Sequence, residues 1–203
     1  MPRVSEEHRE RRRRQILDAA RTCFIRKGIH ATSMQDIFAE AGLSAGAVYL
    51  YFKSKNEIIE ANIAVVIGDL RTFFAELAEG DPLLPVDEVA GRLAARIVAL
   101  SGDDGPLRLA PQAWALATHD PEIAAYVADN VTGLRDTWSR YIRRLVDAGL
   151  LPADTDVAAA GKTLFALFPG FLIQRVLLQD FTPEDMRRGL RSLTRASMVT
   201  LTP

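Results

Sequence analysis

The chain has 203 residues, of which 48% are hydrophobic and 25% charged, and its formal net charge is −1. This balance is typical of a folded globular protein and argues against an intrinsically disordered one. The charge is unevenly spread, because residues 1–55 carry 11 Lys and Arg against 6 Asp and Glu, whereas residues 56–203 carry 14 against 20. A basic front joined to an acidic remainder is expected when one end of a protein meets a polyanion.

The cysteine content and the N-terminal residues indicate the cellular compartment in which the protein is expected to work. The single cysteine, Cys23, cannot form an internal disulfide, which suits a reducing cytoplasm. The basic start "MPRVSEEHRERRRR" is not followed by an apolar segment, so we expect no secretory signal. No run of 18 apolar residues occurs, so we expect no membrane partner, and the spacing of His and Cys predicts no metal site.

The first predicted helix covers "RRRRQILDAARTCFIRKG". Ile16, Ala20 and Phe24 recur every four residues, which places one apolar stripe along a helix. Gly28 follows two basic residues, as a left-handed glycine does at the end of a helix.

A second helix is predicted to begin with a capping box. The box is formed either by Ser33 with Asp36 or by Thr32 with Gln35. Gly42 is then expected to end this helix.

Residues 42–46 read "GLSAG" and fit two different chemistries. The pattern G-x-S-x-G holds the nucleophilic serine of α/β-hydrolases, but it needs a buried strand before it. Here the preceding "SMQDIFAEA" has helical spacing, and the only later histidine, His119, lies in a predicted loop. We therefore interpret Ser44 as the cap of a third helix, and we expect no catalytic residue and no enzyme activity.

The third helix, from Ser44 to about Phe52, is predicted to be the second helix of a DNA-reading helix-turn-helix. Ala45 and Gly46 are small enough for close approach to a duplex. Side chains able to reach phosphate or base edges follow, namely Tyr49, Tyr51, Lys53 and Lys55. Ser54 with Glu57 then predicts the capping box of a fourth helix over 56–80.

Further helices are predicted over 86–100, 107–118, 122–150, 157–179 and 186–201, separated by Pro, Gly and Asp. Pro169 and Gly170 are expected to kink or break one of them. No stretch alternates with the period of a strand. The sequence therefore predicts an all-α fold of about nine helices, with a helix-turn-helix domain over 1–56 and a helical ligand-binding and dimerisation domain over 57–203.

The stretch "ILDAARTCFIRKGIHATSMQDIFAEAGLSAGAVYLYFKSKNEII" resembles the N-terminal DNA-binding domain of the tetracycline-repressor (TetR) family of bacterial transcriptional regulators. The resemblance implies that these residues contact double-stranded DNA: Ser33, Gln35, Ser44, Ala45, Gly46, Tyr49, Tyr51 and Lys55. Arginines 11–14 could reach a neighbouring groove or phosphates. Many members have lysine or glutamine at the position of Ala45, and Leu50 is apolar. We therefore expect few hydrogen bonds to bases and more weight on methyl contacts, DNA shape and phosphate.

Residues 60–203 are similar to the ligand-binding and dimerisation domain of the same family mainly in the order of their helices. The resemblance implies a homodimer on a pseudo-palindromic operator, released by a small effector, which the aromatic content suggests is apolar or aromatic. Trp114 and Phe168 are the candidates for the pocket wall, with Gln174 as a polar contact.

We therefore expect a dimeric cytoplasmic repressor without a cofactor. The alternatives are an activator, a regulator without a ligand, or a helical small-molecule-binding protein or enzyme with a vestigial DNA head.

Overall fold

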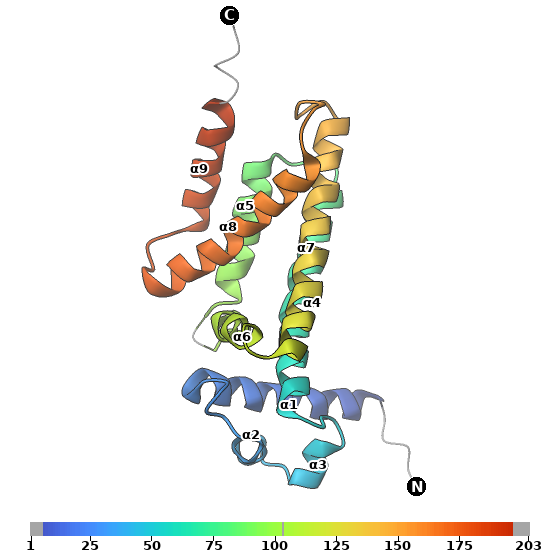
Figure 1. Ribbon diagram of the computed structural model, residues 1–203, viewed down its shortest axis with the longest axis vertical. Coiled ribbons are helices and arrows are strands. Elements are labelled where there is room, and N and C mark those ends of the chain that lie inside the picture. The colour runs from blue at the N-terminus through green and yellow to red at the C-terminus, as the bar shows by residue number, and fades with distance from the viewer. Residues whose placement is uncertain (1–5, 103, 197–203) are drawn as a thin grey trace, which may run out of the picture. The chain divides into compact units, whose positions relative to one another are not determined.

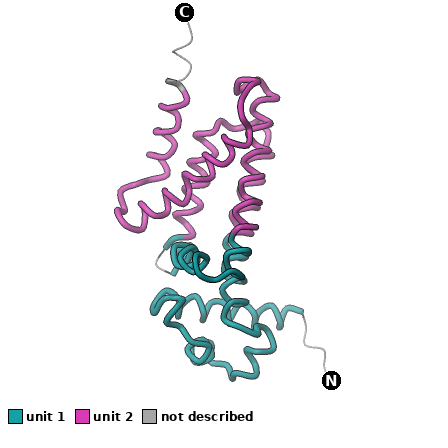
Figure 2. The backbone as a smooth tube through the Cα atoms, in the orientation of Figure 1, with its two compact units in different colours: residues 1–66, 101–127 teal, residues 67–100, 128–203 magenta. Residues whose placement is uncertain are grey.

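The computed structural model describes residues 6–102 and 104–196 (Figure 1). Within these residues it contains nine α-helices, one 3₁₀ helix and no strand, which confirms the predicted all-α class. The chain forms two compact units: unit 1 is residues 1–66 with 101–127, and unit 2 is residues 67–100 with 128–203 (Figure 2). The boundary predicted after residue 56 lies inside unit 1, because this unit includes the start of the fourth helix and a segment from much later in the chain.

Unit 1 contains the predicted helix-turn-helix. Its complete elements are α1 (Glu6–Lys27), α2 (Met34–Ala41), α3 (Ala45–Tyr49), η1 (Pro106–Leu109) and α6 (Ala110–Ala117). It also holds the first parts of α4 (Lys55–Glu79) and α7 (Pro121–Asp147).

A single hydrophobic core joins these elements of unit 1. Ile16 and Phe24 of α1, Ile37 of α2 and Val48 of α3 are fully buried in it. Leu109 and Ile123, which come from η1 and α7, are buried in the same cluster. The apolar stripe predicted for the first helix is therefore the surface on which the helix-turn-helix is assembled.

The turns of unit 1 form as the sequence predicts. Gly28 (φ 87°) and Gly42 (φ 62°) both lie in the left-handed region, where glycine avoids the steric cost of a Cβ atom. Ser33 forms the capping box of α2 with Asp36. The alternative box is not formed, because Ser33 is the N-cap residue, and the Thr32 hydroxyl instead donates to the Gly28 carbonyl at 2.8 Å.

The fourth helix has a modified cap. The Glu57 amide donates to the Ser54 hydroxyl at 3.2 Å, as expected for an N-cap serine. The Glu57 carboxylate, however, accepts from the amide of Lys53 at 2.6 Å and not from that of Ser54. The serine cap is therefore confirmed, and the reciprocal half of the box reaches one residue further back along the chain.

Unit 2 is built around an aromatic core. Besides the remaining parts of α4 and α7, it contains α5 (Val86–Ala99), α8 (Val157–Leu177) and α9 (Pro183–Ala196). The Trp138 ring lies 4.4 Å from that of Phe74 and 5.6 Å from that of Phe168, measured between centroids. The Tyr141 hydroxyl donates to the Leu84 carbonyl at 2.6 Å, and burial raises the pKa of this phenol.

Helices α5 and α9 pack closely together within unit 2 (Figure 1). Arg191 of α9 forms an ion pair with the buried Asp87 of α5, with 2.7 Å between nitrogen and oxygen. Gly91 lets the Arg187 side chain approach the backbone of α5, because a Cβ there would lie 3.1 Å from that side chain. Residues 197–201 of the predicted last helix lie outside the described residues.

Helix α8 differs from expectation at its centre. Of the predicted kink or break, a break does not occur, because the helix runs without interruption through Pro169. Within the described ranges it is also the one helix long and apolar enough to cross a membrane by length and composition. Phe168 and Phe171 of this helix are nevertheless buried in unit 2, while Ile173 and Leu177 are exposed.

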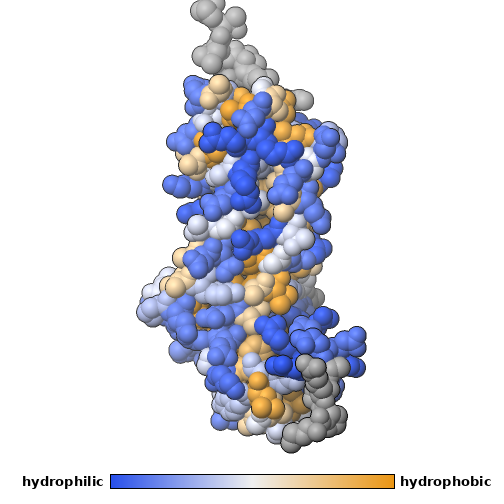
Figure 3. Space-filling view, turned by 90° about the vertical axis from the view of Figure 1, so that its right-hand side faces the viewer, coloured by the Kyte–Doolittle hydropathy of each residue, from blue (hydrophilic) through white to orange (hydrophobic). Residues whose placement is uncertain are grey.

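Hydrophilic side chains cover much of the face shown in Figure 3, with hydrophobic ones between them.

Candidate DNA interface

The turn between α2 and α3 settles the role of Ser44. The Ser44 hydroxyl accepts a hydrogen bond from the Ala47 amide at 3.3 Å, as an N-cap residue does. The segment before the turn is helix α2 and not a strand. The structure therefore confirms the cap and removes the geometry that a hydrolase nucleophile needs.

The start of α3 is open to solvent. Ser44, Ala45 and Gly46 are all exposed. A Cβ placed on Gly46 would have no heavy atom within 4 Å, apart from those of its own chain neighbours and its helix backbone. A duplex could therefore approach this turn of the helix without displacing any side chain.

The end of α3 presents an aromatic ring next to an apolar side chain. Tyr49 is 42% exposed, and its ring packs edge-on against Phe38 of α2 with 5.5 Å between centroids. Leu50, the C-cap residue, is 75% exposed. Tyr51 is half-buried against the core of unit 1. Of the two predicted tyrosine contacts, Tyr49 is thus the more accessible.

The start of α2 combines exposure with a fixed backbone. Ser33 and Gln35 are both exposed. The Ser33 hydroxyl donates to the Asp36 carboxylate at 2.8 Å, and Lys27 donates to the same carboxylate at 2.5 Å. Hydrogen bonds from Lys27 and Ser33 lower the pKa of Asp36. The carboxylate therefore stays ionised and holds the N-terminus of α2 in place.

Lys55 has a structural role that the sequence did not reveal. Its ammonium group donates to the carbonyl oxygens of Ile29 and Thr32, each at 3.0 Å, and to that of His30 at 3.5 Å. These carbonyls belong to the loop that joins α1 to α2. Lys55 therefore ties the start of α4 to the loop before Ser33, and its contact with phosphate stays a prediction that would require it to exchange one of these bonds.

The other cations near α3 are partly engaged. Lys53 is exposed and donates to the Tyr49 carbonyl at 2.5 Å. The Arg13 guanidinium lies 5.4 Å from the centre of the Phe52 ring, and Arg14 pairs with Glu10 at 3.4 Å on the surface of α1. Exposed pairs of this kind contribute little to stability, so these arginines remain able to exchange partners.

Two residues missed by sequence reasoning connect the helix-turn-helix to the rest of unit 1. Gln112 of α6 accepts a hydrogen bond from the Ile29 amide at 2.7 Å. Asn56 at the start of α4 donates to the carboxylates of Asp120 and Glu122 at 3.1 and 2.8 Å. No local pattern could have indicated these contacts, because their partners lie 64 to 83 residues apart in the sequence.

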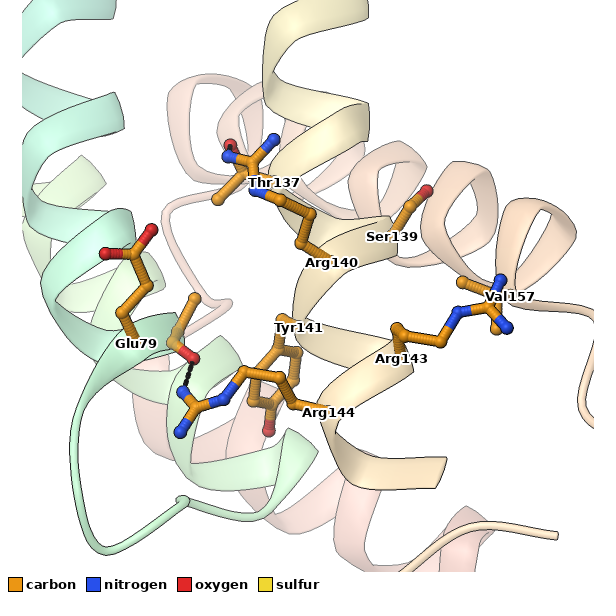
Figure 4. A pocket seen from close by; sticks show the side chains of 9 residues that line it. Glu79, Thr137, Ser139, Arg140, Tyr141, Arg143, Arg144 and Val157 are labelled. Atoms are coloured by element: carbon orange, nitrogen blue, oxygen red, sulfur yellow. Dashed lines mark hydrogen bonds between the residues drawn. The ribbon is translucent and has the colours of Figure 1, made fainter. Parts of the chain in front are cut away.

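The three residues predicted to bind a ligand are divided between the two units. Trp114 is half-buried on α6 in unit 1, whereas Phe168 and Gln174 lie on α8 in unit 2. Phe168 stacks on Trp138 in the aromatic core, and Gln174 is exposed. A cavity in unit 2 is lined by residues of α4, α7 and α8 (Figure 4), and none of the three predicted residues lines it.

The described residues contain no group of three or more His, Cys, Asp or Glu side chains that could hold a metal ion. Cys23 is buried, and burial raises the pKa of its thiol. The groups exposed at the start of α2, on α3 and on Lys53 are hydroxyl, amide, ammonium and apolar ones, which suit binding to a nucleic acid.

Two known families match this chain, one in its N-terminal part and one in its C-terminal part. Residues 16–61 match the family described as bacterial regulatory proteins, tetR family. Residues 103–198 match the C-terminal domain described as a BetI-type transcriptional repressor. The first match covers α2, α3 and the start of α4, where the exposed residues lie.

Individual relatives agree with this assignment. YfiR of Bacillus subtilis, an uncharacterised HTH-type transcriptional regulator, is 49% identical over 57 residues, or 28% of each chain. UidR of Escherichia coli, an HTH-type transcriptional regulator, is 25% identical over 89% of this chain and 90% of its own. The structure of SmeT of Stenotrophomonas maltophilia with triclosan superposes with a TM-score of 0.71 at 25% identity, covering 87% of this chain and 85% of SmeT. The chain belongs to the TetR family and is a helix-turn-helix DNA-binding transcriptional regulator.

Proposed function

We propose that this protein is a dimeric cytoplasmic repressor that binds a pseudo-palindromic operator and is released from it by a small effector. The observation that carries the proposal is the open surface formed by the start of α2 and by α3, which is supported from beneath by the core of unit 1. The proposed DNA contacts are Ser33, Gln35, Ser44, Ala45, Gly46, Tyr49, Tyr51 and Lys55.

These contacts are expected to divide between phosphate and bases. Hydroxyl groups and the ammonium group suit phosphate oxygens, which position the protein on the duplex. Ala45, Gly46 and Leu50 have no side-chain hydrogen-bonding group, so their contribution is to shape and to apolar contact with thymine methyl groups. The operator should therefore be read through methyl contacts more than through bidentate hydrogen bonds.

The apolar exposed side of α8 supports the dimer. Ile173 and Leu177 are four residues apart and therefore lie on one side of the helix, and Leu177 is 73% exposed. Large exposed apolar side chains in a row mark interaction surfaces. We propose that this side packs against a second copy, so that two recognition helices meet half-sites about 34–36 Å apart.

The repressor and effector roles have support from the relatives. The C-terminal match is to a family described as a repressor, and SmeT, described as the repressor of a multidrug efflux pump, is known in complex with triclosan. We propose that an apolar or aromatic compound acts on this chain in the same sense. Trp114, Phe168 and Gln174 stay as proposed contacts.

A reporter gene tests the direction of regulation. The operator, obtained by selection of genomic DNA on the purified protein, is placed over the promoter in a host without this protein. Expression should fall when the protein is supplied and should stay unchanged with the Tyr49→Ala variant. A rise in expression with the wild type would instead make the protein an activator.

A further inference from the structure

The cavity of unit 2 is lined by three arginines of one helix. Arg140, Arg143 and Arg144 of α7 border a volume of about 460 Å³, with the end of α4 on one side and the start of α8 on another (Figure 4). This volume is within the range of small-molecule sites, which is about 300–1,000 Å³.

None of these guanidinium groups forms an ion pair within the described part of the chain. Arg140 donates to the Thr137 hydroxyl at 3.1 Å, and Arg144 donates to the carbonyls of Ala78 and Gly80. Arg143 has no hydrogen-bond partner among the described residues. Other arginines of unit 2 do pair with carboxylates, for example Arg96 with Asp69. Since a guanidinium carries five donors, most donors around the cavity remain unused.

The charge and the walls of the cavity define its occupant. Glu79 is the one acidic residue in the lining, so the three arginines outnumber it. A guanidinium recognises the paired oxygens of a carboxylate or phosphate. Val157 supplies apolar surface beside these donors, while Ala78 and Tyr141 are buried behind the cavity wall.

We propose that this cavity binds a small organic anion, with its carboxylate or phosphate on Arg140 or Arg143, whose side chains point to different sides of the cavity (Figure 4), and its apolar body against Val157. Arg144 is a positioning residue, because its bonds to Ala78 and Gly80 hold the end of α4 at the rim. The proposal deepens the proposed function, since an occupant that contacts one end of α4 is a candidate effector. Helix α4 is continuous from that end to Lys55, which holds the loop before Ser33.

Calorimetric titration of the full-length protein without DNA tests the site. Benzoate and phenyl phosphate are the anionic probes, and benzamide is the neutral probe of the same size. We expect at least one anion to bind about tenfold or more tightly than benzamide. The tighter of the two anions identifies the head group that the site prefers.

Matched variants locate the binding. Arg140→Gln or Arg143→Gln should weaken binding of the anion about tenfold, and the one that does identifies the arginine that holds the head group, whereas Arg135→Gln, on the same helix but outside the cavity, should leave binding unchanged. Unchanged binding in both variants of the cavity would overturn the site. Circular dichroism checks that each variant folds, and Arg140 and Arg143 are both exposed. Equal binding of benzamide, an equal loss in Arg135→Gln, or no heat with either anion would overturn the site. Because no DNA is present, these results leave the DNA-binding proposal standing, and failure to select DNA would leave the anion site standing.

Discussion

Leu50 places an apolar side chain at the exposed end of α3, beside Tyr49. Its predicted target is the 5-methyl group of thymine, which deoxyuridine lacks. Replacing the contacted thymine of the operator by deoxyuridine should weaken wild-type binding by about 0.8 kcal/mol, or about fourfold, the value of one buried methylene-sized group. Fluorescence anisotropy with singly substituted operators measures this.

The Leu50→Ala variant and the deoxyuridine operator together form a double-mutant cycle for the contact between Leu50 and the thymine methyl group. The variant should bind the thymine and deoxyuridine operators equally well, because the protein side of the contact is gone. Leu150→Ala, an exposed leucine outside unit 1, should keep the fourfold difference of the wild type. A difference that persists in Leu50→Ala would mean that another residue reads the methyl group.

Lys53 and Lys55 should behave differently although both follow α3. Lys55→Gln removes an ammonium group held by backbone carbonyls and should lower the free energy of unfolding by about 1–3 kcal/mol. Lys53→Gln should leave stability within about 0.5 kcal/mol, since Lys53 is exposed, and should reduce the salt dependence of DNA binding by about one ion. Urea unfolding and binding at several salt concentrations separate the two effects. Equal unfolding midpoints for the two variants would contradict the assigned role of Lys55.

At the scale of elements, the meeting of α4 and α7 in unit 1 contains a destabilised acid. Burial raises the pKa of Glu60, and the carboxylates of Glu122, Glu57 and Asp120 raise it further. The neutral form is therefore favoured in the folded state, and its stabilising effect is complete below the ordinary pKa of 4.5 and is lost as the pH rises.

Glu60→Gln should consequently raise the melting temperature at pH 7. The gain over the wild type should shrink as the pH falls below about 4.5, because the wild-type carboxyl is then neutral as well. Thermal melts from pH 3 to pH 7, roughly the range in which carboxyl groups titrate, measure the gain. Glu76→Gln, an exposed position of α4, is the control and should show no such trend. A gain from Glu60→Gln that did not change with pH would contradict the account.

Helix ends and turns could be predicted from short sequence patterns, whereas contacts between distant segments could not. Gly28, Ser33, Gly42 and Ser44 act through neighbouring backbone groups, so their roles could be predicted from the sequence. The contact of Gln112 with Ile29 depends on how distant segments pack, and no periodicity encodes it. Pro169 did not interrupt α8, which shows that surrounding packing outweighs a single helix breaker.

At the scale of the whole molecule, the proposed dimer depends on the apolar side of α8. Leu177→Glu should convert the dimer to a monomer, because it places a charge in an apolar interface. Sedimentation equilibrium measures the mass, and Leu150→Glu is the control at another exposed leucine. The monomer should also bind the operator more weakly, because only one helix-turn-helix then contacts the DNA. A dimer that survived Leu177→Glu would place the interface elsewhere.

Selection of genomic DNA shows whether α2 and α3 read a DNA sequence. Fragmented genomic DNA of the host is selected on the purified protein, in parallel with the Tyr49→Ala variant. We expect the wild type to enrich a pseudo-palindromic site, added salt to weaken binding steeply, and the variant to enrich nothing. If the wild type enriches no site even at low salt, or if the variant enriches the same site equally well, the helix-turn-helix surface described here is not the reader.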